Sequence, residues 1–258
     1  MPFLTIKIRT HIFTLMFCGI FGLLPGLTNA EPPTAPSDPA FQKAVEQVVE
    51  QYLRTHPEVI EQSLRILQAK RQAEERERTR QVIATKQAEL LNDPDSPVSG
   101  NLEGDVTVVE FFDYRCGYCK RVAGTVTQLQ QDDPNVRVVY KDYPILGEAS
   151  ELASRAALAS KVQGKHLAFH EALLASEQEL TQETVFSIAT KIGINVEQLQ
   201  KDMGSPSIET MINRNRALAR ELGINGTPGF IVGTELAPGA LELKDLKNLI
   251  RQVRQEKS

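Results

Sequence analysis

The stretch from Val108 to Arg121 constrains the fold of this chain more than any other. A β-branched and aromatic run, VVEFFDY, leads into the pair Cys116 and Cys119, and a helical pattern follows. Such a run indicates a buried strand. A strand that passes directly into a helix puts the first cysteine at the helix N-terminus, where free N–H groups and the helix dipole favour a thiolate. We therefore expect Cys116 to be the reactive thiol and Cys119 the less exposed partner that closes the disulfide.

A Cys-x-x-Cys pair is also half of a common zinc site. Structural zinc needs about four ligands, and the chain has only one other cysteine, Cys18, in its leader segment. His166 and His170 have a spacing that could share a metal, but no third ligand is evident, and a packed or capping role is favoured. The sequence predicts no metal and no cofactor beyond the redox-active disulfide between Cys116 and Cys119.

Residues 1–30 have the pattern of a secretory signal peptide. Lys7 and Arg9 precede an apolar run, and small residues, Thr28 and Ala30, stand at the cleavage-determining positions. A retained membrane anchor is the alternative, although the apolar run is short for a span of about 20 residues. We expect a periplasmic protein, where disulfides persist. A disulfide that closes so short a loop adds little stability, so the pair is there for chemistry.

The full chain has 258 residues and a net charge of −4, which leaves room for one large domain with an appendage and provides no basic surface for nucleic acid. We expect a flexible tether over residues 31–38 and a helical arm over residues 39–95. Apolar residues recur at helical spacing, the arm breaks at His56-Pro57, and residues 70–81 are almost entirely polar. Either this arm oligomerises, which is the favoured interpretation, or it folds back on its own catalytic domain.

The catalytic domain is expected over residues 96–256, with a strand at 106–112, a second at 136–140 and a helical insertion at about 147–223. Glu110 lies inside the first of these strands, with Phe112 on its face and Val109 and Phe111 on the other. Because neither face is polar, we expect a buried acid with a raised pKa that moves protons for Cys119, rather than an outward-pointing strand residue.

Gly226-Thr227-Pro228 opens a later apolar strand. A proline is tolerated at the first position of a strand, and a cis bond there would make a tight turn. Thr227 would then present its main chain beside the active site, where an extended peptide could pair with it. The alternative is an ordinary loop with a trans proline.

From Glu110 through Lys120, and again at Gly226-Thr227-Pro228, the chain resembles the thioredoxin superfamily in its DsbA-like form. The resemblance covers about residues 96–252 and implies an α/β thioredoxin fold with an inserted helical domain, preceded here by the N-terminal helical arm. It also implies that Cys116 is the nucleophile, Cys119 the resolving thiol and Glu110 the buried acid. Substrate contacts are expected at Gly117, Tyr118, Thr227 and Pro228.

The dipeptide Gly117-Tyr118 and the threonine before Pro228 are similar to the DsbC-type isomerases, and the arm resembles the oligomerising extensions of ScsC-like and Com1-like proteins. These resemblances imply a protein disulfide isomerase that forms a dimer or trimer through residues 39–91. Its partners would be secreted client proteins with cysteines and a membrane redox partner. The alternatives are a dithiol oxidase of the DsbA type and, from another class, a chaperone or Cu(I)-binding protein.

Overall fold

The computed structural model describes residues 38–256 of the chain. The predicted signal peptide and the tether up to residue 37 lie outside the described residues. Contacts divide the chain into two units, with the division between Leu64 and Arg65. Within residues 38–256, no helix is both long enough and apolar enough to cross a membrane.

The first unit contains helix α1 (Pro39–Thr55) and the first residues of helix α2 (Glu58–Thr85). Asp38 caps α1 by accepting a hydrogen bond of 2.9 Å from the backbone N–H of Ala40. No residue of α1 is buried. Its exposed apolar side chains follow the spacing that the sequence predicts: Phe41, Val45, Val48, Val49 and Tyr52. This helix therefore presents an apolar stripe that nothing in its own unit covers.

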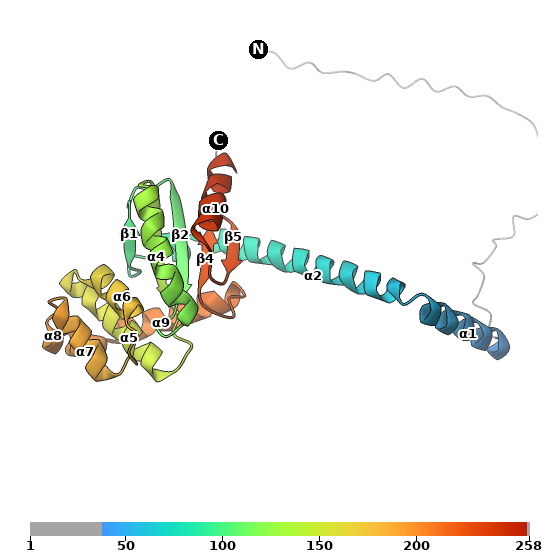
Figure 1. The fold of residues 1–258 in the computed structure, drawn as a ribbon, viewed down its shortest axis with the longest axis horizontal. Helices are drawn as coiled ribbons and strands as arrows, with labels where there is room; N and C mark the ends of the chain where they lie inside the picture. The colour runs from blue at the N-terminus through green and yellow to red at the C-terminus, as the bar shows by residue number, and fades with distance from the viewer. Residues whose placement is uncertain (1–37, 257–258) are drawn as a thin grey trace, which may run out of the picture. The chain divides into compact units, whose positions relative to one another are not determined.

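The second unit is built on a five-stranded sheet with the order β1-β3-β2-β4-β5 (Figure 1). Strands β2 and β3 are parallel, and the other neighbours are antiparallel. The strands are β1 (Val98–Gly100), β2 (Val106–Phe112), β3 (Val136–Asp142), β4 (Gly229–Val232) and β5 (Glu235–Pro238). The predicted α/β class, a thioredoxin fold with N-terminal helices, is confirmed.

Helices cover both faces of this sheet. Helices α4 (Gly117–Asp132) and α10 (Leu243–Glu256) pack in one core cluster with the β2 residues Val108 and Phe112. The helical insertion joins this cluster and follows β3 as α5 (Glu148–Ala159), α6 (His166–Ala175), α7 (Gln182–Lys191), α8 (Val196–Met203) and α9 (Pro206–Glu221). Figure 1 shows α5 to α8 gathered at one end of the sheet, apart from α10.

The opposite face of the sheet is covered partly by the end of the predicted arm. Ile83 of α2 and Leu90 of helix α3 (Gln87–Leu91) are each 1% exposed and pack with Val109 and Phe111. The packing of the second unit therefore begins well before residue 96, where the sequence predicts the domain boundary. A short apolar run in the sequence does not show which surface it packs against. Here that surface is the sheet of the same chain.

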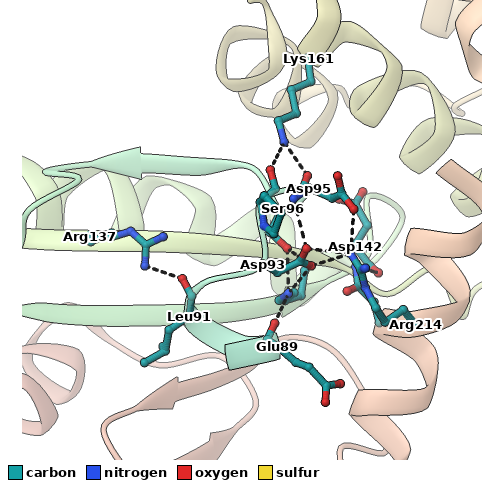
Figure 2. Close-up of polar contacts among 12 residues, drawn as sticks. Glu89, Leu91, Asp93, Asp95, Ser96, Arg137, Asp142, Lys161 and Arg214 are labelled. Carbon is teal, nitrogen blue, oxygen red and sulfur yellow. Dashed lines mark hydrogen bonds and ion pairs between the residues drawn. The ribbon is translucent and has the colours of Figure 1, made fainter. Parts of the chain in front are cut away.

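A polar network fastens the segment after α3 to the same face (Figure 2). The Lys141 ammonium of β3, 1% exposed, donates to Asp93 Oδ2 at 3.0 Å, to Ser96 Oγ at 2.7 Å and to the Glu89 carbonyl at 2.6 Å. Arg214 of α9 also donates to Asp93, at 2.8 Å. A buried charge is tolerated only when it is paired and hydrogen-bonded in this way.

Candidate active site

The two cysteines lie where the sequence predicts, at the start of α4. Cys116 is the N-cap residue of α4, and its extended backbone turns the chain from β2 into the helix. Its residue exposure is 6%, whereas Cys119 is fully buried. Both are free thiols in this structure. Burial raises the pKa of Cys119 far above its usual range. Cys116 is therefore the cysteine that a substrate sulfur can reach, and Cys119 needs a proton acceptor before it can react.

Thr227 and Pro228 lie beside the nucleophile, although they are more than a hundred residues away in the sequence. The Thr227–Pro228 peptide bond is cis. The thiol of Cys116 donates to the Thr227 carbonyl at 3.2 Å. Strand β4 begins at Gly229 and pairs with β2 through Phe111, which brings this loop to the end of β2. The structure thus brings together the two separate motifs of the sequence.

Gly117 and Tyr118 form the first residues of α4, between the cysteines. Tyr118 is 58% exposed, and the guanidinium carbon of Arg121 lies 4.5 Å from the centre of its ring. A cation over an aromatic face is attracted by the ring quadrupole and restricts the ring's motion. Tyr118 therefore offers an exposed aromatic surface next to Cys116.

Glu110 is buried on the face of β2 that carries Val108 and Phe112, the face that packs against α4 and Cys119. It is 2% exposed, and burial raises its pKa to about 8. A carboxyl group with this pKa is mostly protonated at neutral pH and can exchange its proton there, unlike an exposed glutamate. It has the properties of the buried acid that the sequence predicts.

The Glu110 carboxyl makes the folded chain less stable as pH rises. Its ordinary pKa of 4.5 is raised to about 8 in the folded protein, so between these values the unfolded chain has lost a proton that the folded chain keeps. Stability therefore falls across this window. Below pH 4.5 we expect the unfolding free energies of Glu110→Gln and the unsubstituted protein to change with pH in the same way. Between pH 4.5 and pH 8 the Glu110→Gln protein should gain several kcal/mol of stability relative to the unsubstituted protein, on the order of 1.4 kcal/mol per pKa unit.

Urea unfolding at pH 4.5, 6 and 8 measures this difference. Asp142, whose pKa burial raises to about 7, remains in both proteins, so the comparison isolates the Glu110 contribution. An unchanged difference in unfolding free energy across the three pH values would contradict the buried-acid interpretation.

Sequence reasoning did not identify several groups at the carboxyl ends of β2 and β3. Asp113 and Tyr114 follow β2 and are fully buried. The Tyr114 hydroxyl lies 3.1 Å from His170 Nδ1, and the His166 and His170 rings stack with centroids 5.8 Å apart. Polar residues directly after buried parallel strands are the signal that could have identified Asp113. The two histidines take a packed role, and their pKa values are lowered by burial.

Among residues 38–256, no group of three or more histidine, cysteine, aspartate or glutamate side chains could hold a metal ion.

Comparisons with known proteins agree with this geometry. Residues 107–251 match a family model described as the DsbA-like thioredoxin domain, and residues 42–74 match one described as the copper resistance protein ScsC N-terminal domain. The first of these covers more than half of the chain, and the second lies within the helices α1 and α2.

Solved structures are similar over different parts of the chain. A thioredoxin-like oxidoreductase from Silicibacter pomeroyi DSS-3 is 49% identical, with 65% of this chain and 97% of that one covered and a TM-score of 0.64. The thiol-disulfide exchange protein alpha-DsbA2 from Wolbachia pipientis is 34% identical, with 69% and 97% covered and a TM-score of 0.66. A linker-deletion mutant of Proteus mirabilis ScsC is 25% identical, with 87% and 100% covered and a TM-score of 0.65.

The first curated relatives are Na⁺/H⁺ antiporters NhaA, such as one from Salinispora tropica that is 28% identical over 157 residues. The match covers 60% of this chain but only 24% of the antiporter, so the chain spans about a quarter of that relative's length. The resemblance is therefore to one part of the antiporter chain. With a matching domain model over residues 107–251, and Cys116 and Cys119 at the start of α4, the chain belongs to the DsbA-like thioredoxin domain family.

Proposed function

We propose that this chain is a periplasmic, oligomeric thiol–disulfide oxidoreductase that acts mainly as a protein disulfide isomerase. The observation that carries the proposal is the position of Cys116. Its sulfur lies at the N-terminus of α4 and contacts the Thr227 carbonyl at 3.2 Å, next to a buried second cysteine. A cysteine thiolate is the attacking species in exchange, and Cys116 is the cysteine of the pair that is not fully buried.

Exchange begins when the Cys116 thiolate attacks one sulfur of a client disulfide. The client S–S bond breaks, its other sulfur leaves as a thiolate, and a mixed disulfide with Cys116 forms. In isomerisation, another client thiolate then displaces Cys116, and no net oxidation occurs. Alternatively, Cys119 attacks the mixed disulfide, which releases a reduced client and leaves the Cys116–Cys119 disulfide.

The second route requires Cys119 to lose its proton inside the protein. Its pKa is raised by burial, so water at neutral pH does not deprotonate it. Glu110, with a pKa near 8 and on the α4 side of β2, supplies a buried group that can accept and release a proton in this range. Burial alone raises the pKa of Glu110, and burial is the largest cause of the raised pKa of Cys119, to which the neighbouring Cys116 adds.

The arm supports the isomerase assignment. The apolar stripe of α1, from Phe41 to Tyr52, is exposed in the isolated chain and needs a partner surface. A second and third copy of the same helix would cover it, and several active sites on one oligomer raise the effective concentration around a misfolded client. The match of residues 42–74 to the ScsC N-terminal domain also supports this reading. The sequence predicts the oligomer contact over residues 39–91; we propose that the part before residue 82 makes it, because residues 82–91 pack on the sheet of their own chain.

The further partners follow from this activity. An isomerase needs Cys116 reduced, so a membrane redox partner must supply electrons to the Cys116–Cys119 disulfide. The substrates are secreted proteins that contain cysteines. The signal-like leader and the small number of cysteines support a periplasmic location.

Charged substitutions in the α1 stripe are expected to dissociate the oligomer. Val48 and Tyr52 are 67% and 51% exposed, and an aspartate at either position would put an unpaired charge into an apolar interface. Light scattering should give the monomer mass for Val48→Asp and Tyr52→Asp. Gln47→Asp, on the same helix but outside the stripe, is the matched control and should keep the oligomer mass. If the unsubstituted protein itself has the mass of a monomer, the proposal is contradicted.

The isomerase activity is tested by refolding of a protein with scrambled disulfides, with the chain from residue 31 onward as the catalyst. We expect faster recovery of native disulfides than with Cys116→Ser, and a smaller gain with the monomeric Val48→Asp. Strong oxidation of reduced clients without any isomerisation would instead assign the dithiol oxidase function. Tight Cu(I) binding with slow exchange would assign a binding protein.

A further inference from the structure

Asp113, the residue that follows β2, has an unusual set of contacts for a buried acid. It is fully buried, and both carboxylate oxygens accept two hydrogen bonds. Oδ1 accepts from the backbone N–H of Arg115 at 2.7 Å and from the Ser150 hydroxyl at 2.7 Å. Oδ2 accepts from the backbone N–H groups of Ile145 and Leu146, at 2.8 and 3.0 Å. One side chain therefore holds three separate segments together.

These segments are the cysteine turn, the loop after β3 and the first helix of the insertion. The main chain of Asp113 completes the turn, because its carbonyl accepts from the Cys116 N–H at 3.1 Å. The link is reciprocal, since the Arg115 guanidinium donates to the Leu146 carbonyl at 2.5 Å. The turn that carries the nucleophile and the loop at 144–147 are thus hydrogen-bonded in both directions.

The loop that is hydrogen-bonded to the nucleophile's turn also carries exposed apolar side chains. Ile145 and Leu146 are 40% and 42% exposed, although β3 before the loop and α5 after it are largely buried. Their backbone N–H groups, rather than their side chains, are used to fasten the loop. Exposed apolar residues held rigidly beside a reactive thiol form a surface that suits the apolar residues flanking a cysteine in an unfolded chain.

We propose that Asp113 is a positioning residue for client exchange: it holds the Ile145–Leu146 loop in a constant place relative to Cys116, so that the loop binds an unfolded client while Cys116 attacks its disulfide. This inference rests on the proposed function and specifies the substrate class as extended, apolar polypeptide. The Asp113 carboxylate acts through the loop, although the Asp113 main chain also hydrogen-bonds the Cys119 sulfur. Its loss should therefore affect clients that contact the loop more than small disulfides that meet only Cys116.

Asp113→Asn is the most direct variant. An amide has nearly the same shape, but one of its two polar atoms is a donor and cannot accept from the N–H groups or the hydroxyl that face it. Arg115→Lys is the second variant. It keeps the positive charge next to Cys116 and loses the guanidinium contact to the Leu146 carbonyl, and its exposed position makes misfolding no concern.

The experiment measures kcat/KM for exchange in the chain from residue 31 onward with two substrates: a peptide disulfide with apolar residues beside its cysteine, and oxidised glutathione. For Asp113→Asn we expect about a tenfold loss with the peptide, mainly in KM, and less than about twofold with glutathione, since a displacement of about 1 Å at such a site can cost up to 100-fold. Arg115→Lys should show the same selectivity with a smaller loss.

Equal losses with both substrates, or no loss with either, would overturn the role of Asp113. If Asp113→Asn fails to fold by circular dichroism, Arg115→Lys decides the matter: a loss confined to the peptide supports the inference, and unchanged peptide exchange overturns it. An original protein that exchanges with neither substrate would contradict the proposed function itself, and the positioning role with it.

Discussion

Replacing Cys116 with serine is expected to lower thiol–disulfide exchange on the order of 1000-fold or more, as the loss of a nucleophile does in other enzymes. A serine hydroxyl is a far weaker nucleophile towards a disulfide than a thiolate, so the first step of exchange is lost. The rate of reaction with a peptide disulfide, followed by mass spectrometry, measures the effect.

Cys119→Ser is the matched control for this experiment. It keeps the nucleophile but removes the thiol that resolves the mixed disulfide, so the covalent complex between Cys116 and the client should accumulate and be visible on a non-reducing gel. Cys119 is fully buried, and burial raises its pKa, which agrees with a role in the second step only. Equal residual activity in the two variants would show that Cys116 is not the attacking residue.

A chain truncated to residues 96–258 is expected to be largely unfolded, whereas one truncated to residues 65–258 folds. The shorter chain loses Ile83 and Leu90 from the core, and core side chains of this size contribute about 2–5 kcal/mol each. It also removes Asp93 and Glu89, so the Lys141 ammonium loses its ion pair and its hydrogen bond to the Glu89 carbonyl. The sum of the two core contributions is comparable with the whole stability of a typical domain, about 5–15 kcal/mol.

Thermal unfolding followed by circular dichroism compares the two chains. Equal melting temperatures for the 65–258 and 96–258 chains would show that α3 and the segment after it are not part of the folding unit.

The features that sequence predicted well depend on residues close together in the chain. The turn from β2 into α4 follows from a short apolar run next to a helical pattern, and the burial of Glu110 follows from alternation along one strand. Side chains on the same strand face are two residues apart, so the neighbours of Glu110 could be read directly from its sequence. The apolar stripe of α1 follows in the same way from helical spacing.

The features that sequence missed depend on pairing between distant segments. Lys141 lies in a strand where an exposed lysine is the usual expectation, and only the return of the segment around Asp93 makes its burial possible. Likewise, Asp113 shows its importance only when the loop at residues 144–147 folds beside it. Because neither partner is specified by local pattern, the domain boundary and the contacts of Asp113 required three-dimensional structure.

Strand β3 carries two neighbouring residues that serve different sides of the sheet. Lys141 points to the face where the segment around Asp93 is attached, and Asp142, on the alternate face with Tyr140, is buried near Asp113. Adding or deleting a single residue in this strand would exchange the two faces. A lysine would then lie among the buried groups near Glu110, and a carboxylate would face the arginine and aspartate of the attachment. Among homologues of this chain, we therefore expect insertions and deletions in the loops at either end of β3 and not within the strand.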